Sequence, residues 1–279
     1  QSVRIPPFES GGVQKEIRKK KLSEKDAAFI RSLVIFDDGD VIALNKPADL
    51  AVQGGTSTTR HIDGMLDALM NEEGVRPRLG HRLDKDTSGV LLLARSAACA
   101  KALGAAFKGR GIKKIYWALV APCPEIQDGT IRAPLIKSTG NYEKMQVDED
   151  EGKPAITEYK VIENAGRKAA FAVFWPRTGR THQIRIHAAL LGCPIVGDGK
   201  YGVWDNEGNR TDAALLEGLD NTSKTLHLHA ARIMLDHPMQ KGKRLDISAP
   251  LPPVLSKSWK AMGFRTTLKG DPFKDLKHG

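Results

Sequence analysis

The sequence contains few cysteines and no long hydrophobic run. Only three cysteines occur in 279 residues, and Cys99, Cys123 and Cys193 follow neither a disulfide framework nor a metal-ligand spacing. We therefore expect reduced thiols that mostly fill the core of a cytoplasmic protein. No stretch of about 18 apolar residues is present, so no helix is expected to cross a membrane. The first residues also lack the apolar segment of a secretory signal.

Motifs for cofactors and metals are absent as well. The sequence has neither the glycine-rich phosphate loop of nucleotide-dependent enzymes nor the dinucleotide-binding glycine pattern. No zinc-binding cluster is visible, which argues against a zinc deaminase. His182 and His187 do not share a helix face as an i,i+4 pair would, and His227 and His229 have no evident third ligand. We interpret these four as structural histidines and expect no cofactor and no metal.

Positive charge, in contrast, is in excess. Lysine and arginine total 43 against 33 acidic residues, which gives a formal charge of +10 and a pI near 9.5. Such a balance fits a polyanionic partner such as RNA, and it fits equally a basic surface without a partner. The length indicates one large domain or two coupled lobes, and we expect a monomer.

Hydrophobic periodicity predicts more strands than helices. Residues 89–94 form a continuously apolar run that indicates a strand buried on both faces. Ser96 is a suitable N-cap for a helix over 97–108, and Gly192 would end a second helix over 181–191. Other strands are expected at 33–36, 41–45, 114–120, 156–161, 169–175, 226–235 and 244–247, with a helical period over 62–70. The pattern predicts an α+β fold with a mixed, largely antiparallel central sheet and flanking helices and loops.

The polar segment over residues 80–89 is the first candidate for a functional site. It leads directly into the buried strand, and functional groups often lie on loops that a rigid scaffold holds. Asp84 lies close to Arg82 and Lys85, whose charges favour an ionised carboxylate that can act as nucleophile or base. By local chemistry alone, a structural loop with an Asp–Arg pair and a Thr or Ser cap is the simpler interpretation.

The segment His81-Arg82-Leu83-Asp84-x-x-Thr87-Ser88-Gly89 resembles the signature of the RluA family of pseudouridine synthases, and all seven specified positions agree. The resemblance implies that Asp84 is the catalytic aspartate. It also implies that Arg82 fills the gap in the RNA helix when the target base flips out, with His81 beside it in contact with RNA.

Two further segments resemble motifs of this family. Residues 114–118 resemble a Lys-x-Tyr-x-Ala strand, which implies that Tyr116 packs against the target base; a core tyrosine is the alternative. Residues 178–187 resemble a Gly-Arg-x-His-Gln-Ile-Arg-x-His motif, which implies that Arg185 pairs with Asp84. The same motifs imply that RNA is contacted by Lys114, Arg180, His182, Gln183 and Ile184.

Weaker matches extend the resemblance over about residues 33–255, including an Asn-Lys-Pro turn at 45–47 and a segment at 52–55 similar to members that modify large-subunit ribosomal RNA. We expect a catalytic domain over 31–265 and a C-terminal tail over 266–279. Residues 1–30 are expected to be a basic linker. Val3 to Pro7 resemble the last strand of an alpha-L RNA-binding domain, and with the missing initiator methionine this suggests a catalytic fragment.

The resemblance implies isomerisation of specific uridines to pseudouridine in large-subunit ribosomal RNA, by base flipping and an aspartate nucleophile. Three alternatives remain: a transfer RNA substrate, a non-catalytic RNA-binding protein of ribosome assembly, and a glycosidase that uses Asp84 with Asp86. The last requires two carboxylates across a substrate pocket, whereas these two lie on one loop.

Overall fold

The described part of the chain contains more strand than helix, with five helical segments between and beside the strands. The computed structural model describes residues 22–55, 58–109, 111–138, 140, 144–202, 212, 219 and 225–276. The helices are α1 (Glu24–Ser32), the 3₁₀ helix η1 (Asp63–Leu69), α2 (Ala97–Lys108), α3 (Gln183–Leu190) and α5 (Pro253–Ala261). None of these helices is long and apolar enough to cross a membrane.

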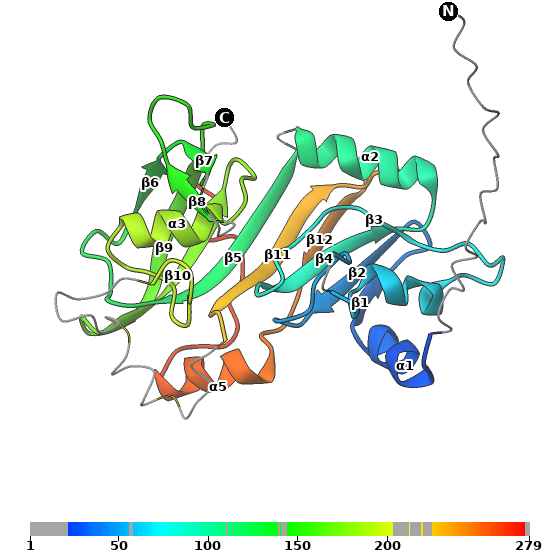
Figure 1. The fold of residues 1–279 in the computed structure, drawn as a ribbon, viewed down its shortest axis with the longest axis horizontal. Helices are drawn as coiled ribbons and strands as arrows, with labels where there is room; N and C mark the ends of the chain where they lie inside the picture. Colours follow the sequence, from blue (N-terminus) through cyan, green and yellow to red (C-terminus); the bar gives the residue numbers. More distant parts are fainter. Residues whose placement is uncertain are drawn as a thin grey trace, which may run out of the picture.

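The strands are β1 (Val34–Asp37), β2 (Val41–Lys46), β3 (Arg78–Leu79), β4 (Ser88–Ala94), β5 (Ile112–Val120), β6 (Asp128–Arg132), β7 (Leu135–Lys137), β8 (Met145–Val147), β9 (Ile156–Ala165), β10 (Ala169–Pro176), β11 (Leu228–Asp236) and β12 (Arg244–Ser248). One large sheet has the order β1-β2-β4-β11-β5-β10-β9-β6, with β3 beside β4 and β12 beside β11, and β7 pairs with β8 separately (Figure 1). β11 runs parallel to β4 and the other pairings are antiparallel. The predicted α+β fold with a mixed, largely antiparallel sheet is confirmed.

The central strand β4 is buried on both faces, as its unbroken apolar sequence predicts. Leu91 and Leu93 belong to the same hydrophobic cluster as Leu66 of η1, whereas Leu92 and its alternate neighbours pack with Leu103 of α2. Each fully buried leucine contributes roughly 1.5–3 kcal/mol. The strand is therefore a rigid support for the loop that precedes it.

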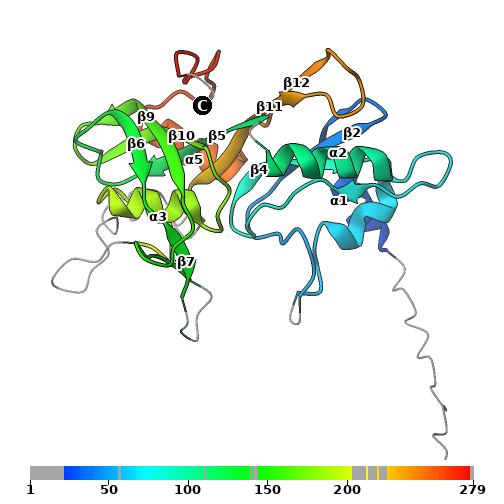
Figure 2. The same ribbon diagram turned by 90° about the horizontal axis from the view of Figure 1, so that it is seen from above.

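The other half of the sheet also has a helix on each face. α3 packs with Ala118 and Phe174, while α5 inserts Trp259 against Phe171, with 5.6 Å between the ring centroids. α2 and α3 lie on the same side of the sheet, over its two halves (Figure 2). The end of α2 and the start of α3 thereby border the same hollow, which contains the site described below.

The packed core extends beyond the domain boundaries that we predicted at residues 30 and 265. α1 lies partly in the predicted linker, yet Ile30 is fully buried, because this helix packs on η1. In the predicted tail, Phe273 is buried beside Trp175, and Lys113 Nζ donates to Asp271 at 2.6 Å. The predicted remnant of an upstream domain lies in residues 1–21, outside the described residues.

Candidate active site

A pocket of about 280 Å³ is lined by the loop over residues 81–87, by β5, by the end of α2 and by residues 176–185. Its size is at the lower end of the range for small-ligand sites. All ten site residues that we predicted from the sequence line this pocket: His81, Arg82, Asp84, Lys114, Tyr116, Arg180, His182, Gln183, Ile184 and Arg185. The structure thus brings together three segments that are far apart in the chain.

The loop that carries Asp84 is anchored where it enters β4. The Ser88 hydroxyl lies 2.9 Å from His229 Nδ1, and His229 Nε2 lies 3.1 Å from the Ala249 carbonyl oxygen. Because Nε2 must donate to that carbonyl, Nδ1 accepts the hydroxyl proton of Ser88. The Thr87 N–H also donates to the Asp84 carbonyl at 3.2 Å and closes a turn. The Asp84 side chain is left 35% exposed, at the pocket.

Gly89 allows β4 to approach β11 at this anchor. Its φ is +114°, and a Cβ there would lie 2.2 Å from the Ala230 carbonyl oxygen. No side chain larger than hydrogen fits such a distance, and the positive φ is itself unfavourable for other residues. The glycine of the Thr-Ser-Gly segment is therefore required by the close contact of two backbones.

Lys46 is a positioning residue to which our sequence analysis assigned no role. Its buried ammonium donates to the carbonyls of Pro47, Leu50 and Lys85, each at 2.9 Å. Burial lowers the pKa of Lys46 to about 7, although the negative charges of Asp86 and Asp84 raise it. Since Lys85 follows Asp84, this side chain ties the Asp84 loop to the Asn-Lys-Pro turn. The Asn-Lys-Pro turn at residues 45–47, which resembles the family, was the sequence feature from which a role for Lys46 could have been predicted.

His81 supports the loop, although we predicted contact with RNA. Its ring stacks on Phe107 at 4.2 Å, and its Nε2 accepts the Leu92 N–H at 3.0 Å. Burial lowers the pKa of His81 to about 3, which keeps the ring neutral and able to accept this bond. The ring lines the pocket, but its hydrogen bonds are made to the protein backbone.

Lys114 and Tyr116 occupy alternate positions of β5 and both line the pocket, as the period of two predicts. Burial raises the pKa of Tyr116, and the Asp84 charge raises it further, so its hydroxyl stays protonated. Burial lowers the pKa of Lys114. Among the described side chains, none forms a hydrogen bond or ion pair with its ammonium.

Arg185 binds Asp198, in place of the predicted pair with Asp84. Its Nε and Nη2 donate to the two Asp198 carboxylate oxygens at 2.7 and 2.6 Å, and both side chains are buried. Burial raises the pKa of Asp198, but the hydrogen bonds and the charge of Arg185, together with the N–H groups of Lys200 and Tyr201, outweigh burial and lower the pKa. The remaining nitrogen, Nη1, lies 3.6 Å from Asp86 and has no hydrogen bond in the described structure.

Gln183, for which we predicted contact with RNA, lines the pocket and forms hydrogen bonds within the protein. Its side-chain oxygen accepts from the Thr178 hydroxyl and the Arg180 N–H, and its nitrogen donates to Ile156 and Thr157. These four bonds shape the turn that precedes α3. Arg180 remains exposed at the pocket, and Ile184 is an almost buried apolar contact at its edge.

His182 lies between Asp84 and Tyr201, a residue to which our sequence analysis assigned no role. Its Nε2 is 3.9 Å from Asp84 Oδ2, and its Nδ1 is 2.7 Å from the Tyr201 hydroxyl. Burial lowers the pKa of His182, although the Asp84 charge opposes the shift. His182 is thus the described side chain closest to forming an ion pair with the predicted catalytic aspartate.

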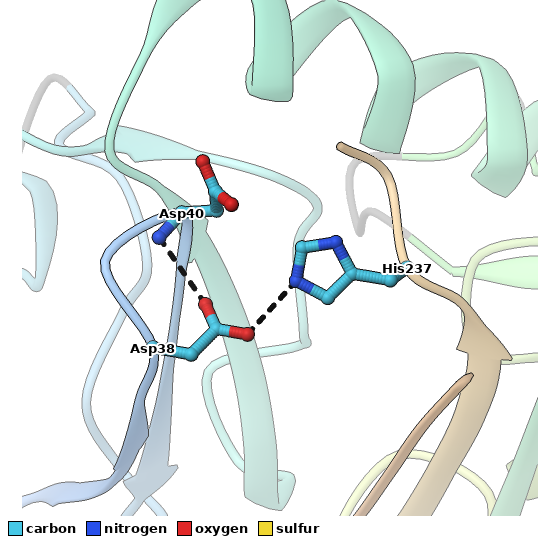
Figure 3. A group of neighbouring side chains, drawn as sticks. All are labelled: Asp38, Asp40 and His237. Atoms are coloured by element: carbon cyan, nitrogen blue, oxygen red, sulfur yellow. Dashed lines mark hydrogen bonds and ion pairs between the residues drawn. The ribbon is translucent and has the colours of Figure 1, made fainter. Parts of the chain in front are cut away.

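The remaining histidines have structural contacts. His187 bonds to Thr157 and Ala133, and His227 bonds to Val196 and Ser258. The ring of His237 lies against Asp38, with Asp40 nearby (Figure 3).

This last group is a poor metal site. His237 Nδ1 accepts the N–H groups of Met239 and Gln240, and Nε2 lies 2.8 Å from Asp38 Oδ2. A ring that accepts at Nδ1 carries its proton on Nε2, so it has no free lone pair for a metal. The contact instead ties the β1–β2 turn to the end of β11.

Comparison with known proteins places these features in a family. Residues 40–190 match the model of the RNA pseudouridylate synthases. "Ribosomal large subunit pseudouridine synthase C" of Rickettsia prowazekii (strain Madrid E) is 39% identical over 233 residues, which are 83% of this chain and 71% of the relative. The protein of the same name from Salmonella typhimurium is 35% identical over 259 residues, 91% of this chain and 77% of the relative.

A solved structure agrees with the sequence relatives. "Human RNA Pseudouridylate Synthase Domain Containing 4" superposes with a TM-score of 0.71 at 26% identity, covering 86% of this chain and 97% of that chain. The chain therefore belongs to the RNA pseudouridylate synthase family and is an RNA pseudouridine synthase, an isomerase.

Proposed function

We propose that this enzyme isomerises specific uridines of large-subunit ribosomal RNA, with Asp84 as the nucleophile. The observation that carries the proposal is a single pocket that combines a partly exposed carboxylate, Asp84, with a partly buried tyrosine, Tyr116, and the ammonium of Lys114, which has no acidic partner among the described residues. The substrate class is inferred from the relatives, which are named ribosomal large subunit pseudouridine synthases.

The reaction rearranges the uridine without adding or removing atoms. The bond from uracil nitrogen 1 to ribose carbon 1′ breaks, the base turns, and carbon 5 bonds to carbon 1′. Carbon 5 loses its proton and nitrogen 1 gains one. Asp84 attacks the sugar or the uracil, or first removes a ribose proton, and each of these steps uses the ionised carboxylate.

The target base must leave the RNA stack to reach Asp84, which costs a few kcal/mol. Tyr116 would stack on the extruded uracil, and such stacking contributes about 1–3 kcal/mol per base. Arg82 is exposed at the pocket and would occupy the gap that the base leaves. Lys114 and Arg180 would bind phosphates, which makes RNA binding dependent on salt.

Asp84→Asn should abolish turnover and leave folding and RNA binding unchanged, because the amide keeps the shape but cannot act as nucleophile. Release of tritium from carbon 5 of labelled ribosomal RNA measures the reaction. Asp275→Asn, which changes an exposed acid outside the pocket, should behave like wild type.

Three outcomes would contradict the proposal. Release at the wild-type rate by Asp84→Asn would remove Asp84 as nucleophile. Release by the wild-type enzyme from transfer RNA, with none from ribosomal RNA, would change the substrate class. Binding without any release would show an RNA-binding protein.

A further inference from the structure

A series of contacts leads from strand β8 to Asp84 through two side chains that the proposed chemistry does not use. The Met145 N–H donates to the Tyr201 hydroxyl oxygen at 2.9 Å. The same oxygen lies 2.7 Å from His182 Nδ1, and His182 Nε2 lies 3.9 Å from Asp84 Oδ2.

The hydroxyl of Tyr201 determines which nitrogen of His182 carries the proton. This hydroxyl accepts from Met145, and its other hydrogen-bond partner among the described residues is His182 Nδ1, so it donates its proton there. A ring that accepts at Nδ1 carries its hydrogen on Nε2. The nitrogen that carries the hydrogen is therefore the one that lies 3.9 Å from Asp84 Oδ2.

We propose that Tyr201 is a positioning residue for Asp84, acting by holding His182 as a hydrogen-bond donor directed at the carboxylate. This inference rests on the proposed role of Asp84 as nucleophile. At 3.9 Å the N–H orients the carboxylate electrostatically without engaging a lone pair in a short bond. A short, charge-assisted bond would stabilise the anion and make it a weaker nucleophile.

The surrounding structure holds both side chains in place. The Tyr201 N–H donates to Asp198 Oδ1 at 3.0 Å, and the same carboxylate binds Arg185. His182 precedes α3 with a φ of +53°, in the left-handed region. One buried acid, Asp198, therefore positions both the arginine and the tyrosine.

Tyr201→Phe tests the role of the hydroxyl, because it keeps the ring beside Arg185 and His182 and removes only the O–H. Loss of one hydrogen bond should lower kcat about three- to tenfold, and KM for ribosomal RNA should stay within about twofold. Tyr159→Phe is the matched control. It removes a hydroxyl bound to the Ile126 carbonyl, outside the pocket, and should leave kcat unchanged.

Two substitutions of His182 separate the donor from the ring. In His182→Gln the side-chain amide nitrogen reaches the place of Nε2, whereas in His182→Asn it reaches only that of Nδ1. His182→Gln should therefore retain more of kcat, even though asparagine tolerates the left-handed backbone better. Nitrogen NMR of labelled wild-type enzyme should show His182 Nδ1 without a proton.

The possible failures are distinguishable. Inactive wild type, or active Asp84→Asn, overturns the proposed function and with it this inference. With Asp84→Asn inactive, wild-type kcat in Tyr201→Phe overturns the role of Tyr201 alone. A proton on His182 Nδ1, or equal kcat in the glutamine and asparagine variants, overturns the donor assignment.

Discussion

Lys114 carries the least compensated charge of the described pocket. Its side chain is partly buried on β5, burial lowers its pKa, and no acid within the described residues pairs with it. A partly buried ammonium without an acidic partner is unfavourable for stability, so we infer that Lys114 has a role in binding. A phosphate group of the RNA would supply the missing negative charge.

Lys114→Met should weaken RNA binding about equally for target and non-target sequences, because phosphate contacts carry no sequence information. The slope of log affinity against log salt should become less steep by roughly one. Filter binding across a salt series measures both quantities. Lys260→Met, on the exposed face of α5, should leave the slope unchanged; equal slopes for Lys114→Met and wild type would show that Lys114 contacts no phosphate.

Some residues of the motifs both line the pocket and support its structure. His81 and Gln183, for which we predicted contact with RNA, form hydrogen bonds with the protein through their polar side-chain atoms. A motif match reports that a residue type is needed at a position. It does not show whether the residue contacts the substrate or stabilises the structure of the pocket.

At the level of secondary structure, the contact between β4 and β11 controls the position of the Asp84 loop. The two strands run parallel only briefly, with His229 opposite Ser88 and Ala230 opposite Gly89. Their backbones approach so closely that Gly89 has no room for a side chain. Any displacement of β11 at this point therefore displaces the segment that carries Asp84.

Gly89→Ala should destabilise the protein by several kcal/mol, because the added methyl group would overlap the Ala230 backbone and the positive φ adds strain. Thermal unfolding measures the effect. Gly104→Ala is the control, since a Cβ there meets nothing within 4 Å, and an alanine inside α2 should stabilise the helix by about 0.5–1 kcal/mol. A melting temperature of Gly89→Ala within the range of wild type would contradict the packing argument.

The periodicity of the sequence predicted most of the elements, including the short strands β1 and β12, but several others were not predicted. The strand at 89–94 and the helix at 97–108 correspond to β4 and α2, whose N-cap is Ser96. The residues with a helical period at 62–70 form the 3₁₀ helix η1, and the elements that were not predicted are α1, α5, β3, β6 and the β7–β8 pair. β3, β7 and β8 are only two or three residues long and contain too little periodicity. Helices as short as α1 and α5 depend on packing against the rest of the fold, which the local sequence does not show.

For the whole molecule, buried neutral histidines link stability to pH. Burial lowers the pKa of His81 to about 3 and the pKa values of His227 and His229 to about 4, from 6.5. Below pH 6.5 the unfolded chain binds these protons, whereas the folded protein does not until about pH 4. Unfolding therefore takes up protons, and stability falls as the pH decreases from 6.5 towards 4.

Each of these histidines should remove up to about 1.4 kcal/mol of stability per pH unit within that window. Urea unfolding at about pH 7 and about pH 5 measures the loss. His227→Gln should reduce the pH dependence by one proton, because glutamine does not titrate. Constant stability between these two pH values would show that the histidines are protonated in the folded state.

Local sequence was sufficient to predict the family, the α+β class and the ten residues that line the pocket. Motifs, caps and apolar runs are properties of neighbouring residues, so they can be recognised without the tertiary structure. The hydrogen-bond partners of the polar and charged side chains could not be predicted from the local sequence, because packing determines them. Arg185 binds Asp198, Lys46 binds the carbonyl of Lys85, and Tyr201 binds His182. A buried polar group must bond to whatever the fold places beside it, and only the packing of distant loops determines which group that is.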